Sequence, residues 1–285
     1  MFGRRPDGRR IKSLDPIFYV GPMIMPKRTD AQVFADMVVD ITAVDRYVKA
    51  NKAEHPGITH MTVIMSAMAK VFSEIPALNR FIMKKRVYAR KNLSVCCTVV
   101  NEFGPEEPDE TVIKIFFENG DNVFSVADKI KKETDIAKTP TEPNAVDKFL
   151  KLVFKLPTGF IGGVLSFILW LDRRGMAPKS VVTMSPFHTS MYVTNMASIG
   201  MNSVYHHIYD NGNTSMFLAM GKREYAPTFD KNGLKSTARS MHFKFVVDER
   251  ICSGYVYSKA FKAFEKYIKH PELLENPLEI KQDVK

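Results

Sequence analysis

The residues best suited to proton transfer or nucleophilic attack lie in one turn near the end of the chain. Residues 241–247 alternate as in a strand, and the run Asp248-Glu249-Arg250-Ile251-Cys252-Ser253-Gly254 follows, with a carboxylate, a thiol and a hydroxyl close together. A cysteine becomes a nucleophile when a neighbouring base or cation lowers the pKa of its thiol. No histidine stands beside Cys252 to act as its base. We therefore expect Cys252 to be a small buried hydrophobic residue.

Histidines elsewhere could supply a general base, because a neutral imidazole takes up and returns a proton near pH 7. His188, His206 and His207 lie in predicted loops, and His242 lies in the strand before the turn. His242 lies seven positions before Glu249, and because this spacing is odd, their side chains should point to opposite faces of that strand. The loop histidines are expected to be ordinary hydrogen-bonded residues. A role as base stays open for all three of them.

These residues must be positioned by a mixture of strands and helices. Alternation and short apolar runs predict strands at 32–41, 86–89, 93–100, 112–117, 190–195, 214–221 and 241–247. A period of 3.6 residues predicts helices at 42–52, 62–75, 123–134, 146–171 and 258–269. Capping boxes are expected from Thr42 with Asp45 and from Ser125 with Asp128. The strands at 86–89 and 93–100 should form a hairpin around residues 90–92.

This order of elements predicts an α+β fold built on one large mixed sheet flanked by helices. A single domain is expected at 31–275, between a basic N-terminal arm at 1–30 and a polar tail at 276–285. The segment 139–180 is an apolar insertion. Its uncharged part, 156–171, is shorter than the roughly 20 residues of a membrane span. We expect a buried helix pair or a subunit contact there, and weak contact of 149–174 with a membrane surface is the alternative.

The net charge and the cysteine content indicate which ligands, partners and cellular compartment to expect. The chain of 285 residues has a net charge of +10, but only its first 30 residues are markedly basic. No basic stripe with interleaved aromatic residues appears, so we expect an anionic small ligand or an acidic partner rather than nucleic acid. Three cysteines show neither a disulfide framework nor metal-ligand spacing, so no metal is expected. With no signal peptide at the N-terminus, the expected location is cytoplasmic.

The turn at 248–254 and the helix after it resemble a known catalytic motif. Together with Met241–Val247 and His270-Pro271-Glu272-Leu273-Leu274, they are similar to the end of the 2-oxoacid dehydrogenase acyltransferases, whose turn reads D-H-R-x-x-D-G. Further stretches agree with that family in order and spacing, so that the resemblance covers roughly 30–275. They are Asp36–Asp45, Ile58–Phe81, Asn92–Val100 and Met191–Gly200. The resemblance implies a chloramphenicol acetyltransferase-like fold and a homotrimer with its active site between subunits.

The same resemblance implies acyl transfer between a lipoyl thiol and coenzyme A. At the positions of the family's histidine and aspartate this chain has Glu249 and Ser253. Thr194 takes the position of the oxyanion donor, with Asn195 beside it. Coenzyme A or acyl-CoA is the expected substrate. The chain shows no lipoyl domain, so a lipoyl or other acyl-carrier protein would be a separate partner.

The two replacements leave the activity open. A carboxyl with a pKa near 4.3 is a poor base for a thiol near 8.5, and raising it to ~7 requires about 3.7 kcal/mol. Burial can supply that much. The first hypothesis is therefore a stand-alone acyltransferase with an altered catalytic apparatus. The alternative is an inactive pseudoenzyme that binds an acyl carrier or serves as an assembly scaffold, with Glu249 as a structural residue.

Overall fold

A computed structural model describes residues 5–100, 110–138, 158–229, 232–233 and 235–283. A large mixed sheet runs through it in the order β2-β9-β8-β7-β5-β6, and a small sheet has the order β1-β4-β3. The strands are β1 (Gly8–Arg10), β2 (Gln32–Asp40), β3 (Arg80–Met83), β4 (Arg86–Arg90), β5 (Leu93–Val100), β6 (Glu110–Phe117), β7 (Met191–Asn195), β8 (Met216–Phe229) and β9 (Lys235–Asp248). The helices are α1 (Ile17–Ile24), α2 (Thr42–Asn51), α3 (His60–Glu74), α4 (Val123–Lys138), α6 (Thr158–Arg173), α7 (Lys179–Met184) and α8 (Gly254–Lys269).

The large sheet is parallel only at its centre. Strand β7 pairs in parallel with β5 and β8, and the other neighbours pair antiparallel. Strands β8 and β9 form a long hairpin whose register shifts between Met220 and Arg223. Strand β2 lies at one edge of the sheet and β6 at the other. The mixed sheet agrees with the predicted fold class.

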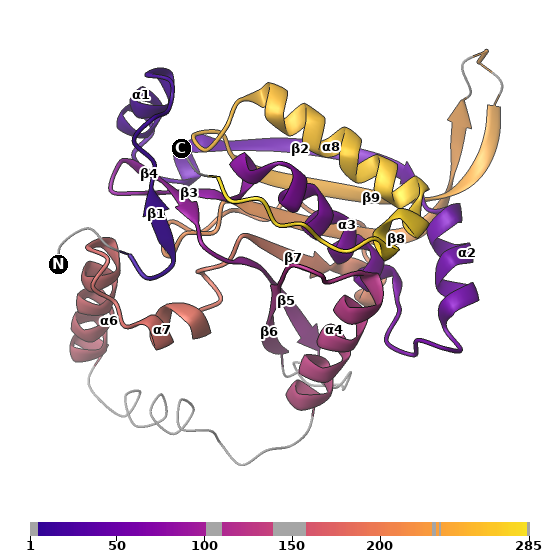
Figure 1. Cartoon of the computed structure of the whole chain (residues 1–285), viewed down its shortest axis with the longest axis horizontal. Helices are drawn as coiled ribbons and strands as arrows, with labels where there is room; N and C mark the ends of the chain where they lie inside the picture. Colours follow the sequence, from indigo (N-terminus) through magenta and orange to yellow (C-terminus); the bar gives the residue numbers. More distant parts are fainter. Residues whose placement is uncertain (1–4, 101–109, 139–157, 230–231, 234, 284–285) are drawn as a thin grey trace.

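Helices α3, α4 and α8 cover one face of the large sheet, as Figure 1 shows. Alternate residues of a strand point to the same face, and on β9 Phe243 and Phe245 point towards these helices. Both rings contact Phe264 of α8 edge-on. On the opposite face, Val246 packs in a small separate cluster with Phe217 and Ile208. The main core therefore lies between the sheet and the helices.

One predicted hairpin is wrong. Strand β4 pairs with β3 and not with β5, which belongs to the large sheet. The turn between β3 and β4 is made by Lys84 and Lys85, whose φ angles are 48° and 59°. Two lysines give no turn signal, because glycine or asparagine normally takes such left-handed positions. The tight turn was therefore not recognisable in the sequence.

Both predicted capping boxes are also wrong. The carboxylate of Asp40 accepts the backbone N–H of Thr42 at the start of α2. The side chain of Asn122 accepts the N–H groups of Phe124 and Ser125 at the start of α4. Short acidic and amide side chains cap a helix as well as a serine or threonine does. The helices begin near the predicted positions, but other residues satisfy their free N–H groups.

The first 30 residues, predicted as an irregular arm, contain β1 and α1 and contact distant parts of the chain. Strand β1 pairs with β4. Arg5 is buried and donates to both Asp172 and Asp7. Burial opposes the charge of Asp172, but His188 and Arg5 together lower the pKa of its carboxyl. The basic residues of this segment are therefore partly internal, because folding gives them carboxylate partners.

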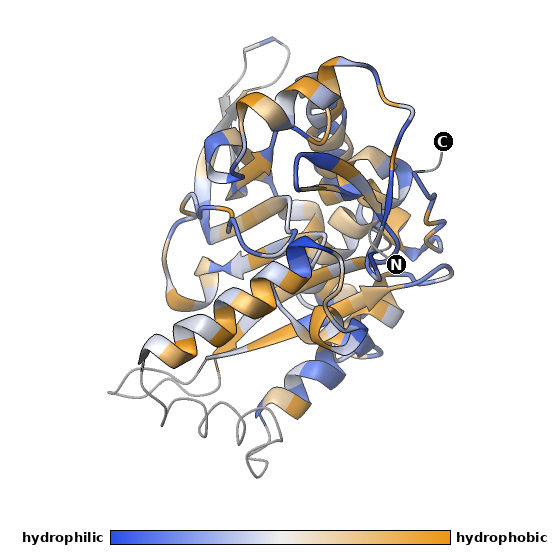
Figure 2. Cartoon of the chain, turned by 90° about the vertical axis from the view of Figure 1, so that its left-hand side faces the viewer, coloured by the Kyte–Doolittle hydropathy of each residue, from blue (hydrophilic) through white to orange (hydrophobic). Residues whose placement is uncertain are grey.

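The predicted apolar helix at 146–171 is observed as α6, and residues 139–157 lie outside the described part of the chain. Helix α6 is hydrophobic along much of its length (Figure 2), and several of its large apolar side chains are exposed to solvent. These are Phe160, Leu165, Phe167 and Trp170. In the single chain α6 is thus not a buried core helix. No helix among the described residues is both long and apolar enough to cross a bilayer.

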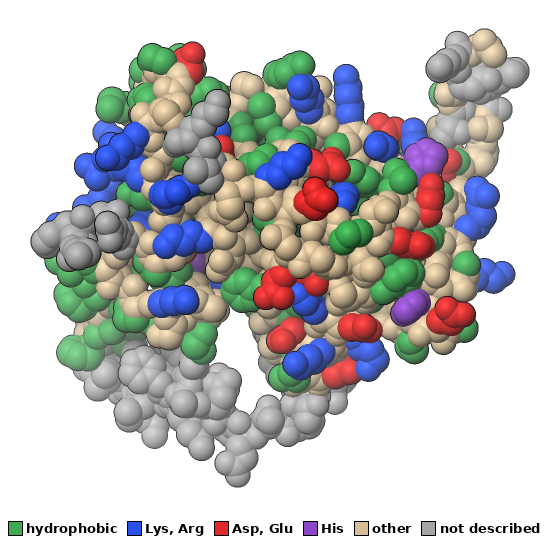
Figure 3. Space-filling view, viewed as in Figure 1, with side chains coloured by type: hydrophobic (Ala, Val, Ile, Leu, Met, Phe, Trp, Pro, Cys, Tyr) green, Lys and Arg blue, Asp and Glu red, His purple; other side chains and the backbone are tan. Residues whose placement is uncertain are grey.

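Charged side chains are distributed unevenly over the surface. In the view of Figure 3, acidic and basic side chains intermingle over the α4 and α8 side, and basic ones predominate towards α1 and β1. Of the tail predicted at 276–285, the structure describes residues up to 283, and Leu278 there is buried and exchanges backbone hydrogen bonds with Gly120 and Asp121. Hydrogen bonding of the backbone fixes this segment despite its polar composition.

Candidate functional site

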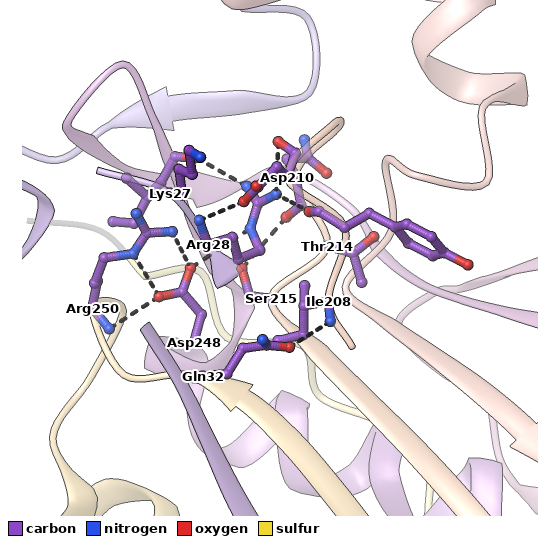
Figure 4. Close-up of polar contacts among 12 residues, drawn as sticks. Lys27, Arg28, Gln32, Ile208, Asp210, Thr214, Ser215, Asp248 and Arg250 are labelled. Carbon is purple, nitrogen blue, oxygen red and sulfur yellow. Dashed lines mark hydrogen bonds and ion pairs between the residues drawn. The ribbon is translucent and has the colours of Figure 1, made fainter. Parts of the chain in front are cut away.

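The turn after β9 is held by a buried ion pair. Arg250 donates two hydrogen bonds to the carboxylate of Asp248, at 2.8 and 2.7 Å (Figure 4). The guanidinium of Arg28 lies 3.6 Å from the same carboxylate. All three side chains are almost fully buried. Tyr257 of α8 donates its hydroxyl hydrogen to the backbone carbonyl of Asp248, so the turn is fixed to the helix that follows it.

Arg28 joins the N-terminal segment to the loop before β8. It donates to the carbonyl oxygen of Tyr209, and Asp210 accepts the backbone N–H groups of Arg28 and Thr29 (Figure 4). Burial lowers the pKa of Arg28, and Asp248 opposes this effect. Burial alone would raise the pKa of Asp210, but these hydrogen bonds lower it overall. Arg28 therefore positions the turn, a role that its place in a basic segment did not indicate.

Glu249, at the position of the family's histidine, is exposed and lies beside a groove between β2 and α8. The groove has a volume of about 420 Å³. Its walls include Val33, Ala35 and Met37 of β2 and Phe261 of α8. The backbone N–H of Glu249 donates to the carbonyl of Ala31, which fixes the main chain of the turn. The carboxylate is thus presented at an apolar groove from a rigid backbone.

The other two side chains of the turn differ in accessibility. Ser253 is exposed at the start of α8, where its side chain makes no capping hydrogen bond. Cys252 is 1% exposed, as expected from the sequence. Burial raises the pKa of its thiol to about 12, so at neutral pH it is protonated and unreactive. Of the two, only Ser253 is placed to meet a ligand.

Thr194, at the position of the oxyanion donor, and Asn195 beside it lie at the end of β7. Asn195 lines a cavity of about 530 Å³, and its buried Oδ1 has no hydrogen-bond partner. The hydroxyl of Thr194 donates a weak hydrogen bond to the sulfur of Met196, at 3.7 Å. A buried polar atom without a partner is costly, and so Oδ1 marks a place for a polar ligand group.

The cavity and the groove lie at different places in one chain. Met241 of β9 lines the cavity, and Val247 of the same strand lines the groove. Six residues of strand span about 20 Å. A single chain therefore does not bring Glu249 and Ser253 together with Thr194 and Asn195.

The histidines singled out from the sequence all have protein neighbours. The Nδ1 atom of His188 lies 2.8 Å from the Ser185 hydroxyl, and its Nε2 lies 3.2 Å from Asp172, too poorly aligned to count as a hydrogen bond. His206 stacks on His207. The Nε2 atom of His242 lies 3.3 Å from Glu224 on β8. None of them lines the groove at Glu249.

One histidine that sequence reasoning missed lies in the cavity beside Asn195. His60, the first residue of α3, approaches Asp45 of α2 with its Nε2 2.6 Å from Oδ1. Asp45 was expected to cap α2. The two residues are 15 positions apart, and no local motif predicts that they meet. Among the described residues no cluster of three or more potential ligands could hold a metal ion.

One segment of the chain matches a known protein family. Residues 187–275 match the family described as 2-oxoacid dehydrogenases acyltransferase (catalytic domain). No curated protein sequence matches the chain. The matched segment, residues 187–275, includes β7, the β8–β9 hairpin, the Glu249 turn and α8. The match therefore contains all four candidate residues at 194, 195, 249 and 253.

Several solved structures share the fold. Chloramphenicol acetyltransferase has a TM-score of 0.59 at 12% identity, covering 92% of this chain and 100% of that chain. The cubic core of the pyruvate dehydrogenase multienzyme complex has a TM-score of 0.58 at 14% identity, covering 93% of both chains. A structure of Azotobacter vinelandii dihydrolipoamide acetyltransferase has a TM-score of 0.55 at 13% identity, covering 93% of both.

Identities this low establish the fold and leave the function to the site. The predicted architecture is confirmed by these structures, and the family resemblance by the matched segment. The chain therefore has the chloramphenicol acetyltransferase-like fold, and its residues 187–275 match the catalytic domain of the 2-oxoacid dehydrogenase acyltransferases.

Proposed function

We propose that the protein binds acyl thioesters of coenzyme A or of a lipoyl-type carrier between the subunits of a homotrimer and transfers the acyl group to a thiol. The observation that carries this proposal is the separation of Asn195 and Glu249, which line two hollows about 20 Å apart along β9. A site shared by two subunits would join the Glu249 groove of one to the Asn195 cavity of the next. The solved cubic core supports an assembled form for this fold.

The edge strand β2 supports association between subunits. Phe34 is 54% exposed and Val38 is 50% exposed. Edge strands with exposed apolar residues tend to pair with another chain unless something covers them. The groove at Glu249 lies next to the same strand. Because Phe34 and Val38 alternate with the groove residues of β2, they point to the opposite face of the sheet, and a partner subunit would have to pair along the edge of β2 to contact both faces.

Each candidate residue has a role in this proposal. Thr194 would donate its hydroxyl to the developing oxyanion, since among the described residues this hydroxyl has just the weak hydrogen bond to the sulfur of Met196. Asn195 would bind a polar group of the ligand in the cavity. Glu249 and Ser253 would line the thiol side of the shared site. In Azotobacter vinelandii dihydrolipoamide acetyltransferase a serine, a histidine and an asparagine have been studied for their part in the mechanism.

The first experiment measures coenzyme A binding by calorimetry and the transfer of acetyl groups from acetyl-CoA to dihydrolipoamide. We expect the wild-type protein to bind, to transfer and to sediment as a trimer. Glu249→Gln should retain binding, because the amide keeps the shape of the side chain while removing its charge. Lys262→Gln, a charge-removing change at the far end of the groove, is the matched control.

The outcome also decides between an enzyme and a scaffold. Binding without transfer in both wild type and Glu249→Gln would show an acyl-carrier-binding pseudoenzyme, which the exposed position of Glu249 favours. A monomer that binds no coenzyme A would contradict the proposal as a whole. The three free, buried cysteines suit a reducing compartment such as the cytoplasm.

A second role, contact with a membrane surface, is supported by helix α6. Its exposed Phe160, Phe167 and Trp170 lie on a helix that ends in basic residues, and Arg174 stacks 3.7 Å from the Trp170 ring. A helix with large apolar side chains and basic residues can lie in the interface of an anionic bilayer. The alternative is that another subunit covers α6.

Flotation with vesicles of anionic phospholipid tests this second role. We expect the wild type to float and the double substitution Phe160→Ser with Phe167→Ser to remain in the soluble fraction. Tyr225→Ser and Phe229→Ser, which remove equally exposed aromatic residues from the β8–β9 hairpin, serve as the control. A wild-type protein that does not float would assign α6 to a protein contact instead.

A further inference from the structure

The cavity beside Asn195 contains a histidine and carboxylate pair that the motif does not include. We propose that His60, oriented by Asp45, is the group that takes the proton from the acceptor thiol in this protein. The inference rests on the proposed acyl transfer, and it deepens it by naming a base in place of the missing histidine. It places that base on α3, in the same subunit as Thr194 and Asn195.

The pair has the geometry of an oriented imidazole. The Nε2 atom of His60 lies 2.6 Å from Oδ1 of Asp45, and the two side chains are 21% and 20% exposed. Asp45 is also held by Arg239 at 3.4 Å and by Arg223 at 3.8 Å. These two arginines hold the carboxylate of Asp45 in position. The carboxylate of Asp45 therefore offers the His60 ring a fixed hydrogen-bond acceptor.

This contact decides which ring nitrogen is available. A carboxylate accepts hydrogen bonds, so Nε2 of His60 donates in its 2.6 Å contact with Asp45, which is shorter than the 3.3 Å between Nε2 and Nη1 of Arg223. The neutral ring then has an unprotonated Nδ1. Within the part of the chain that the structure describes, no residue donates a hydrogen bond to this atom. Nδ1 is thus the free acceptor of a histidine that lines the cavity.

The cavity around His60 suits a thioester. Its apolar wall is made by side chains from α3, β5, α4, β8 and β9, which are Met61, Val99, Ile130, Met220 and Met241. The polar atoms facing it include the unpartnered Oδ1 of Asn195. Charged side chains from α4 and β8 also line the cavity, and they are Lys131, Asp135, Lys138 and Arg223. An apolar chain with an anionic end would match this arrangement.

His60 can account for both proton transfers that the reaction requires. Nδ1 of His60 takes the proton of the acceptor thiol, and the sulfur attacks the thioester carbonyl carbon. The side-chain amide of Asn195, which lines the same cavity as His60, donates an N–H to the oxyanion. When the old carbon–sulfur bond breaks, the imidazolium returns its proton to the leaving thiolate. Asp45 touches no reacting atom and is a positioning residue.

A second pair of the same kind provides the matched control. His242 of β9 lies 3.3 Å from Glu224, with side chains 30% and 33% exposed. It is adjacent in sequence to Met241, which lines the cavity, and so it points to the other face of the sheet. A purely structural effect of losing a histidine–carboxylate pair should therefore appear in both variants.

The test measures acetyl transfer from acetyl-CoA to dihydrolipoamide, together with calorimetric binding of coenzyme A, in the full-length protein. We expect His60→Gln to lower kcat by ~10² to 10⁴-fold, the range of a positioned general base. Coenzyme A affinity and the melting temperature should stay at wild-type values. His242→Gln should transfer at the wild-type rate.

The outcomes separate this inference from the proposed function. Wild-type transfer in His60→Gln overturns the role of His60 and leaves the acyltransferase in place. A wild type that binds coenzyme A without transferring also overturns it, and leaves an acyl-carrier scaffold. A wild type that neither binds nor transfers contradicts both. ¹⁵N NMR of the wild-type imidazole adds a readout that needs no variant. We expect His60 protonated at Nε2, with an Nδ1 resonance that shifts when acetyl-CoA is added, and an Nδ1–H tautomer would contradict the proposal.

Discussion

Placing histidine at 249 and aspartate at 253 in the His60→Gln variant is expected to raise acetyl transfer by ~10² to 10⁴-fold. The turn that would carry the new histidine is already rigid, because Asp248, Arg250 and Tyr257 hold its backbone. An imidazole with a pKa near neutrality is better matched to a thiol than a carboxyl is. The His60→Gln background removes the base that we propose, so the gain measures the new histidine alone.

The aspartate at 253 should cost little stability. Ser253 is the N-cap residue of α8 and makes no capping hydrogen bond. Aspartate is as good an N-cap as serine, and a negative charge is favourable at a helix N-terminus. The single variants Glu249→His and Ser253→Asp, in the same background, are the controls. If all three variants remain at the His60→Gln rate although coenzyme A still binds, the groove at Glu249 does not reach the reacting thiol.

Asp248→Asn is expected to destabilise the fold by about 3–5 kcal/mol, the usual cost of removing one partner of a buried ion pair. Its carboxylate accepts two hydrogen bonds from Arg250 and lies 3.6 Å from Arg28. The amide would leave two buried guanidinium groups without their shared negative charge. At roughly 2–4 °C per kcal/mol for a chain of this size, the melting temperature should fall by about 6–20 °C.

Thermal unfolding at fixed protein concentration checks this, because the proposed trimer would make the melting temperature depend on concentration. Lys269→Gln is the matched control, since Lys269 forms an exposed helical pair with Glu265. Exposed pairs of this type contribute ~0.3–0.5 kcal/mol. A loss for Asp248→Asn no larger than that of Lys269→Gln would mean that water reaches the pair and that it does not hold the turn.

The periodicity of apolar residues predicted those helices and strands whose own side chains carry that periodicity. Helix α3 and strands β2 and β7 were expected near the observed positions, because side-chain periodicity is a property of neighbouring residues. The last strand, the turn and α8 also carried the resemblance that the comparison confirmed. The burial of Cys252 followed from its surroundings in the sequence. Where the prediction failed, as at Lys84 and Lys85, the turn used residue types that carry no turn signal.

The site itself combines both kinds of information. Sequence patterns were enough to identify the scaffold and to show that Glu249 and Ser253 replace the family's histidine and aspartate. Tertiary contacts were needed to place Glu249 at a groove, to place Asn195 in a separate cavity further along β9, and to bring His60 to Asp45 in that cavity. The physical reason is that α2, α3 and the β8–β9 hairpin are brought together by the burial of apolar faces. Burial fixes which polar side chains meet at the edges of those faces, and no spacing along the chain records that outcome.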